Sequence, residues 1–315
     1  MYFLKRIAFA IPLLIAISMI AFVLVRLPQG GPFDHERKPA SPEIERNINA
    51  RYHLDEPVWK QYLRYIGAWW ERDEKGEWHH APAGFNASLR YRNHAVLDLI
   101  ATGLPISLTI GLLAFCFSMA IGLPLGFFAA SKRGRWQDRL LNLLALLSVC
   151  VPGLVIGPLL ALVFGIKLRL LPVALWESPV SAVMPVVALG IYYSGRVARL
   201  MREGMLSVMQ NEFITAARAK GLSETQLLFR HGLRLAILPV ISYSGPMLAD
   251  LLTGSFIVES VFQLPGLGVF LVNSLYNRDY PMTVGLVLLY AAVLLGLNLI
   301  VDAIHAWLDP RIKYG

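Results

Sequence analysis

The sequence contains little charge and almost no cysteine. Only 16% of its 315 residues are charged and 56% are hydrophobic, whereas about a quarter of the residues in a soluble domain are charged. This deficit indicates a membrane protein. The two cysteines, Cys116 and Cys150, lie inside apolar runs. A disulfide framework or a cysteine-based metal site is therefore excluded, because both need more cysteines at regular spacing.

The usual nucleotide-binding loop is also missing. The sequence has no G-x-x-x-x-G-K-[ST] motif and no Gly-Lys dipeptide, so we expect no ATP site in this chain. His79 and His80 have no carboxylate or cysteine at ligand spacing, and we expect solvated loop histidines and no metal site. The net charge of +8 lies mainly in segments that flank apolar runs, which argues against nucleic acid as a partner.

Six apolar runs are long enough to cross a bilayer, for which a helix needs about 20 residues. They lie within residues 7–25, 99–131, 140–166, 178–195, 235–258 and 280–301. The first run follows Lys5 and Arg6, but it is long for a signal core and no small-residue cleavage site follows it before Arg26, so we interpret it as a retained span. The sequence predicts an all-α membrane protein with six transmembrane helices.

Lysine and arginine are concentrated in alternate connecting segments, which predicts that both termini are cytoplasmic. The long segment from about 28 to 98 is then outside, and its basic and acidic residues nearly balance. The two short loops on the outer side hold only Lys167, Arg169 and Arg278. The basic residues assigned to the inner side are Lys5, Arg6, Lys132, Arg133, Arg135, Arg139, Arg196, Arg199, Arg202, Arg218, Lys220, Arg230, Arg234, Arg311 and Lys313.

Glycine and proline interrupt two of the spans, in "GLPLG" at 122–126 and "PGLVIGP" at 152–158. One interpretation is close packing, because small residues at this spacing let helix backbones approach. The other is that proline bends these helices around a pathway that opens and closes. No internal repeat of two matched halves is visible, which argues against a secondary transporter.

The outside segment contains "SPEIERNINARYHLDEPVWKQYLRYIGAWW", residues 41–70. Ser41, followed by proline and glutamate, is a candidate N-cap of a first helix. Pro57 interrupts that helix, and apolar residues at helical spacing over 59–66 predict a second one. This small helical segment either contacts a soluble partner or covers the outer loops.

The stretch "NEFITAARAKG", residues 211–221, is a polar, alanine-rich insert between two apolar runs. Asn211 is a candidate N-cap with Glu212 in the first turn, and Gly221 is a candidate helix end in the left-handed conformation. Ser223 and Gln226 then predict a capping box at the start of another helix. A helix, a sharp turn and a second helix would form a stiff elbow suited to transmit motion from a soluble partner.

Charges inside apolar runs mark candidate functional residues. Asp250, within the fifth run, is the best candidate for a substrate pathway; the alternative is a carboxylate hydrogen-bonded to a neighbouring helix. Glu259 just beyond that run is a second candidate, and Asp302 is interpreted as structural. An intramembrane aspartyl protease would pair Asp250 with Asp302, but its Gly-x-Gly-Asp pattern is absent. An ion-coupled transporter working alone is disfavoured by the elbow and the missing repeat.

The segment "TAARAKG" followed by "RHGLRLAILP" resembles the EAA loop of transmembrane subunits in bacterial ABC importers. More narrowly, the chain is similar to the B-type permease subunit of oligopeptide, dipeptide and nickel systems. The stretches "RYHLDEPVWKQYLRYI", "GLPISLTIGLLAF", "GSFIVESVFQLPGLG", "NRDYPM" and "DPRI" occur in the same order, and the resemblance covers essentially the whole chain. Thr215 stands where the general EAA pattern has glutamate, so a salt bridge of that glutamate is not expected here.

The resemblance implies the type I ABC importer fold, with six transmembrane helices and a small extracytoplasmic helical segment after the first. Residues 1–95 would hold the first helix and the extracytoplasmic segment. Residues 96–315 would form the transmembrane domain, with cytoplasmic coupling helices at about 211–230. The implied location is the bacterial cytoplasmic (inner) membrane.

The resemblance also implies a permease subunit that forms half of a translocation pathway for peptides, with nickel or a metal chelate as the alternative cargo. Such a chain is not an enzyme, because two separate ATP-binding subunits would bind ATP and Mg. A second, C-type permease and an extracytoplasmic solute-binding protein are the other implied partners. Asp250 and Glu259 are candidates for the pathway. The residues expected to couple to an ATPase are Glu212, Thr215, Ala216, Ala217, Arg218, Lys220 and Gly221.

Overall fold

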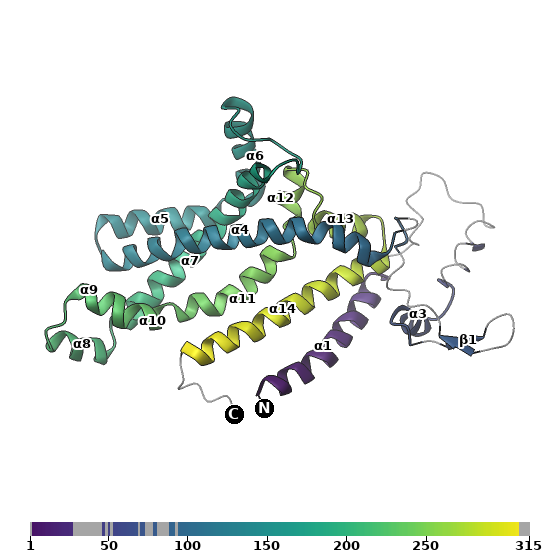
Figure 1. The fold of residues 1–315 in the computed structure, drawn as a ribbon, viewed down its shortest axis with the longest axis horizontal. Helices are drawn as coiled ribbons and strands as arrows, with labels where there is room; N and C mark the ends of the chain where they lie inside the picture. The colour runs from purple at the N-terminus through teal and green to yellow at the C-terminus, as the bar shows by residue number, and fades with distance from the viewer. Residues whose placement is uncertain are drawn as a thin grey trace. The chain divides into compact units, whose positions relative to one another are not determined.

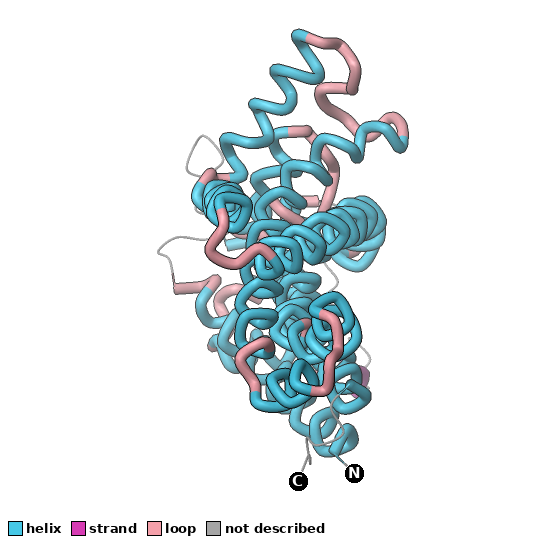
Figure 2. Tube along the Cα trace, turned by 90° about the vertical axis from the view of Figure 1, so that its left-hand side faces the viewer, coloured by secondary structure: helices cyan, strands magenta, loops and turns pink. Residues whose placement is uncertain are grey.

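The computed structural model describes residues 2–27, 46–47, 50, 53–68, 70–72, 78–80, 88–91 and 94–308. Contacts within the chain define two compact units. The first consists essentially of Phe3–Leu104 and Val269–Ala292, and the second of Pro105–Gly268 and Val293–Gly315. The boundary expected between residues 95 and 96 stays a prediction. Figure 2 shows that helices make up most of the described chain.

The first unit contains α1 (Tyr2–Leu24), α3 (Val58–Tyr65) and the first parts of α4 (Val96–Ser131) and α14 (Tyr280–Leu308), together with most of α13 (Leu267–Tyr276). Phe22 of α1, Tyr65 of α3 and Val284 of α14 are buried in one apolar core. The hydroxyls of Ser18 and Tyr62 are 2.6 Å apart and share a hydrogen bond, which ties α3 to α1.

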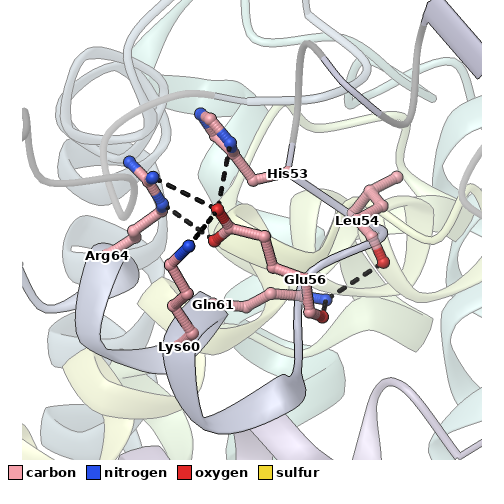
Figure 3. A network of polar contacts seen from close by, with 6 residues as sticks. All are labelled: His53, Leu54, Glu56, Lys60, Gln61 and Arg64. Atoms are coloured by element: carbon pink, nitrogen blue, oxygen red, sulfur yellow. Dashed lines mark hydrogen bonds and ion pairs between the residues drawn. The ribbon is translucent and has the colours of Figure 1, made fainter. Parts of the chain in front are cut away.

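Helix α3 confirms the second helix expected in the outside segment, while Ser41 lies outside the described residues. Figure 3 shows how its first turn is held: Glu56 accepts hydrogen bonds from Arg64 at 3.0 and 3.2 Å and lies 2.7 Å from the ammonium of Lys60. Partial burial alone would raise the pKa of Glu56, but the bonds from Arg64 and Lys60 hold that pKa below its usual value. The carboxylate therefore stays charged and holds Glu56 to two successive turns of α3, through Lys60 and Arg64.

The all-α prediction misses a short antiparallel pair of strands, β1 (Trp70–Arg72) and β2 (Trp78–His80). Trp70 pairs with His80, and Arg72 pairs with Trp78. His79 and His80 thus lie on a strand and not in a loop. Aromatic residues favour strands, and a turn of a few residues can join antiparallel neighbours. Two strands of three residues are too short for a clear period-2 pattern in the sequence.

Asp279, in "NRDYPM", is fully buried at the start of α14. Its carboxylate accepts hydrogen bonds from the Ser88 hydroxyl and from the backbone N–H groups of Leu89, Arg90 and Met282. A buried carboxylate needs such partners, because an unpaired one costs several kilocalories per mole. Within the first unit, Asp279 therefore joins residues 88–90 to the end of a span.

The second unit is arranged around α7 (Val183–Val208), which continues from a 3₁₀ turn, η3 (Pro179–Ala182). Helices α5 (Trp136–Cys150), α6 (Gly153–Leu160), α10 (Leu233–Ala236) and α11 (Leu238–Leu252) all pack against it. Val197, Met201 and Met205 of α7 have no exposed surface. Figure 1 shows α7 running behind α5 and α4 toward α10.

The two glycine and proline motifs behave differently. "GLPLG" confirms close packing: α4 stays one helix of 36 residues, and a Cβ on Gly122 would come within 2.7 Å of the Ser194 carbonyl oxygen on α7. "PGLVIGP" instead marks a bend of 96° between α5 and the helix formed by α6 and η2 (Ala161–Lys167). Val151 is extended there, as expected for a residue before proline. The bend expected from proline is confirmed in this run, while its place beside a pathway stays a prediction.

Four helices in the described residues are long and apolar enough to cross a membrane: Val96–Ser131, Pro179–Val208, Leu233–Val261 and Tyr280–Ile304. The bent pair Trp136–Cys150 and Gly153–Lys167 makes a fifth if it is counted as one span. Within α1, the apolar stretch Ala8–Leu24 is shorter. The membrane character is confirmed, and the count of six stays a prediction.

An ion pair joins the start of α5 to α7. Asp138 is 4% exposed and accepts hydrogen bonds from Arg202 at 2.6 and 2.9 Å and from the Gly134 N–H at 3.0 Å. Gly134 has a φ of +77°, which lets the loop after α4 turn back onto α5. This two-bond pair fixes the loop, α5 and α7 together.

We expect Asp138→Ala to lower the free energy of unfolding by about 2 to 3 kcal/mol. Removing one partner of a fully buried pair costs about 3 to 5 kcal/mol, and the Arg202 side chain keeps 23% of its surface exposed. The measurement is unfolding of the purified chain in mixed detergent micelles.

Glu224→Ala is the matched control, because Glu224 forms the same two-bond contact with Arg218 but both side chains are largely exposed, at 61% and 47%. Exposed pairs contribute little to stability. Equal losses in the two variants would show that the Asp138–Arg202 pair does not hold α5 to α7.

Candidate functional site

The elbow, residues 211–226, has the geometry that its sequence predicts. Helix α8 (Glu212–Ala219) ends at a turn in which Gly221 has a φ of +83°, and α9 (Glu224–Gln226) follows. The capping box is confirmed: Ser223 N–H donates to the Gln226 side chain at 3.2 Å, and Gln226 N–H donates to Ser223 Oγ at 3.3 Å. Asn211 occupies the N-cap position of α8, but its side chain makes no capping hydrogen bond.

One side of the elbow is anchored in the second unit. Ile214 of α8 is fully buried in the same core as Met205 and Val208 of α7. Leu227, the first residue of the π-helical turn η4 (Leu227–Gly232), is also fully buried. A shift of α8 must therefore displace the end of α7, because close-packed interiors do not compress.

The other side of the elbow is open to solvent. Of the residues expected to couple to an ATPase, Ala217 is half-buried and the rest are exposed: Glu212, Thr215, Ala216, Arg218, Lys220 and Gly221. Figure 1 shows α8 and α9 beyond the end of α10. This surface combines small side chains with charges of both signs, so a partner backbone can approach it closely.

An ion pair that the sequence reasoning missed bridges the turn of the elbow. Arg218 Nε lies 2.6 Å from Glu224 Oε1, and Arg218 donates a second hydrogen bond to Glu224 at 3.2 Å. The hydrogen bond from Arg218 holds the pKa of Glu224 below its usual value. The pair is too exposed to stabilise the fold much, but it restricts the angle between α8 and α9. The sequence does contain a signal for this pair, because Arg218 and Glu224 carry opposite charges on either side of the predicted turn.

Asp250 combines features of both interpretations made from the sequence. It lies on α11, and its carboxylate accepts a hydrogen bond from the Tyr193 hydroxyl on α7, as the structural alternative expected. Its side chain is nevertheless exposed in this chain, whereas Tyr193 is buried. The carboxylate is thus held by a neighbouring helix and still accessible to a ligand. Its role in a pathway stays a prediction.

Glu259 has very different surroundings. It lies on α12 (Phe256–Val261), is 2% exposed, and accepts a hydrogen bond from the Ser107 hydroxyl of α4 at 2.8 Å. Ser107 Oγ in turn accepts the Leu267 N–H at 2.9 Å. The carboxylate joins α4, α12 and the loop before α13, and its burial favours a structural role over contact with a solute.

Glycines surround the Glu259 carboxylate and leave it no spare room. A Cβ on Gly266 would lie 2.6 Å from both carboxylate oxygens, and one on Gly268 would lie 3.0 Å from Oε2. Gly254 has a φ of +87° at the break between α11 and α12. The glycines of "GSFIVESVFQLPGLG" therefore allow the backbone to close around one charged group.

A family model described as "Binding-protein-dependent transport system inner membrane component" matches residues 122–314. The oligopeptide transport system permease protein OppB of Haemophilus influenzae is 40% identical over 313 residues, covering 98% of both chains. OppB of Salmonella typhimurium is 37% identical, covering 99% of both chains. The dipeptide transport system permease protein DppB of Bacillus subtilis is 34% identical, covering 99% of this chain and 97% of the relative.

Solved structures show the same fold at lower identity. A chain of the MetNI methionine ABC transporter in an inward-facing conformation is 17% identical with a TM-score of 0.55, covering 68% of this chain and 97% of that one. A chain of an amino acid ABC transporter is 20% identical with a TM-score of 0.52, covering 67% and 94%. The sequence relatives and the shared fold agree with the resemblance seen in the motifs. The chain belongs to the family of inner membrane components of binding-protein-dependent transport systems.

Proposed function

We propose that this chain is the permease subunit of an ABC importer that carries peptides across the bacterial inner membrane. The observation that carries the proposal is identity of 34% to 40% with oligopeptide and dipeptide permeases over nearly their full length. Because these relatives are named for oligopeptides and dipeptides, a peptide is favoured over the alternative cargo, nickel or a metal chelate. The chain forms half of the pathway, and a C-type permease forms the other half.

Energy comes from two separate ATP-binding subunits, and an extracytoplasmic solute-binding protein delivers the cargo. Both termini and the elbow lie on the cytoplasmic side, as the distribution of lysine and arginine indicates. The exposed side of α8 docks on an ATPase subunit through Glu212, Thr215, Ala216, Ala217, Arg218, Lys220 and Gly221. Closure of the ATPase pair then moves the elbow.

The contacts inside the second unit support a mechanical route from the elbow to the spans. Ile214 transfers a displacement of α8 to Met205 and Val208 on α7. The pair between Arg202 and Asp138 extends that displacement to α5. In this mechanism the chain provides a pathway and a lever, and no covalent chemistry. Asp250 is exposed to the pathway, while Glu259 positions the outer ends of the helices around it.

We expect Gly221→Val to weaken docking of the ATPase subunits and to abolish ATP-driven uptake, while insertion in the membrane stays normal. The φ of +83° is unfavourable for a β-branched residue, and such strain costs about 1 to 3 kcal/mol. The surroundings contribute no clash, because nothing lies within 4 Å of an added Cβ. Co-purification of the ATPase subunits and uptake in reconstituted vesicles measure the two effects.

Gly221→Asn is the matched control, since asparagine adopts the left-handed conformation more readily than valine. It should keep most of the docking and uptake. Wild-type docking and uptake in the valine variant would mean that the elbow does not couple the chain to its ATPases.

The cargo is tested in vesicles that contain the complete importer, with its binding protein outside and ATP inside. We expect ATP-dependent accumulation of a labelled tripeptide and no accumulation of nickel ions or a nickel chelate. Nickel uptake without peptide uptake would replace the peptide assignment by the alternative.

A further inference from the structure

Two opposite charges and three tyrosines share one face of α7 and α11. On α7, Arg196 donates a hydrogen bond to the Tyr192 hydroxyl at 3.3 Å, and its guanidinium lies 5.4 Å from the ring centre of Tyr243 on α11. Tyr193 donates to Asp250, and the rings of Tyr192 and Tyr193 are in edge-to-face contact with centres 5.0 Å apart. We name these five residues the polar face.

The charged members of the polar face are accessible, although both helices belong to candidate membrane spans. Arg196 and Asp250 have exposed side chains, and they lie within Pro179–Val208 and Leu233–Val261 respectively. A charge within a span, such as that of Asp250, is costly against lipid and is found beside a water-filled cavity or another protein. Arg196 lies in the half of Pro179–Val208 that is nearer the elbow. The polar face is therefore turned toward the interior of the importer.

The two charges are separated along the helices and each is held by tyrosine. Tyr243, beside Arg196, precedes Asp250 by seven residues on α11, a rise of about 10 Å in an α-helix. Arg196 is nearer to the elbow along both helices, and Asp250 is nearer to α12. An extended peptide rises by about 3.3 to 3.6 Å per residue, so about three residues span the same length.

We infer that the polar face binds a short peptide by its two ends, with the terminal ammonium at Asp250 and the terminal carboxylate at Arg196. This inference rests on the proposed function and adds the orientation of the cargo. A guanidinium pairs well with a carboxylate, and a carboxylate with an ammonium. The hydroxyls of the half-buried Tyr192 and Tyr243 can both donate and accept hydrogen bonds, as the peptide backbone requires, while the buried Tyr193 holds Asp250 in place. None of these groups selects a side chain, which suits cargo of varied sequence.

The assigned orientation sends the carboxyl terminus into the cytoplasm first, since Arg196 lies on the elbow side of Asp250. Selectivity for the two ends is measured with trialanine, its N-acetylated form and its C-amidated form, in vesicles that contain the complete importer. Uptake is divided by the amount of assembled complex, so that loss of assembly does not imitate loss of binding.

We define the penalty for a blocked end as the uptake of trialanine divided by the uptake of the blocked peptide. We expect Asp250→Asn to reduce the penalty for N-acetylation by about tenfold relative to wild type, the factor that one charge-assisted hydrogen bond contributes. The penalty for C-amidation should not change in this variant. Arg196→Gln should show the opposite pattern. The controls are Glu177→Gln and Lys167→Gln, which remove exposed charges outside α7 and α11. Both should leave the two penalties unchanged. Any contribution of the binding protein to a penalty is the same in all variants.

Photolabelling of the wild-type importer gives a second measurement that needs no variant. A tripeptide with a photoreactive first residue should label the chain near residue 250, and one with a photoreactive third residue should label it near residue 196. The inference would be overturned by reversed labelling, by labelling elsewhere, or by unchanged penalties in both variants. In each of these cases ATP-driven peptide uptake would still support the proposed function. Absence of ATP-driven peptide uptake by the wild-type importer would instead contradict the proposed function.

Discussion

Close packing around α7 is the constraint on which the second unit depends. Apolar side chains gain little by leaving lipid for protein, so helices in a membrane associate through close contact, hydrogen bonds and small residues. A Cβ on Gly126 of α4 would lie 2.8 Å from Met201, and one on Gly195 of α7 would lie 2.6 Å from the Ala145 carbonyl oxygen of α5. Any larger residue at these positions would separate the helices, and the contacts of α7 would be lost.

The same packing explains how the elbow is suited to act on the helices of the proposed pathway. Ile214 belongs to the core that contains α7 and α11, so a displacement of α8 reaches the helices that carry the polar face. At the other end of α11, the Glu259 carboxylate joins α12, α4 and the loop before α13. The short helix α8, the packed central helix α7 and the fixed end of α11 beside α12 together favour rigid rearrangement of the spans over local deformation.

Features set by neighbouring residues were predictable from the sequence, and features set by distant contacts were not. The capping box of α9 and the positive φ of Gly221 follow from a few adjacent residues. Proline marks the bend after Val151, but from the sequence alone close packing was the favoured interpretation and bending the alternative. The Asp138–Arg202 pair joins positions 64 residues apart, and Glu259 is buried against a serine 152 residues away. No local pattern identifies the partners of Asp138 and Glu259, so the burial of Glu259 against Ser107 could not be predicted and its candidacy for the pathway stays a prediction.

The central claim is that the exposed side of α8 contacts an ATPase subunit. A photoreactive amino acid at Ala216, on that side, tests it in the complete importer, and the control position is Leu143, which is 51% exposed on α5. The account predicts an adduct with the ATPase subunit from position 216 and none from position 143. An importer that still takes up peptide but forms no ATPase adduct from position 216 would contradict it.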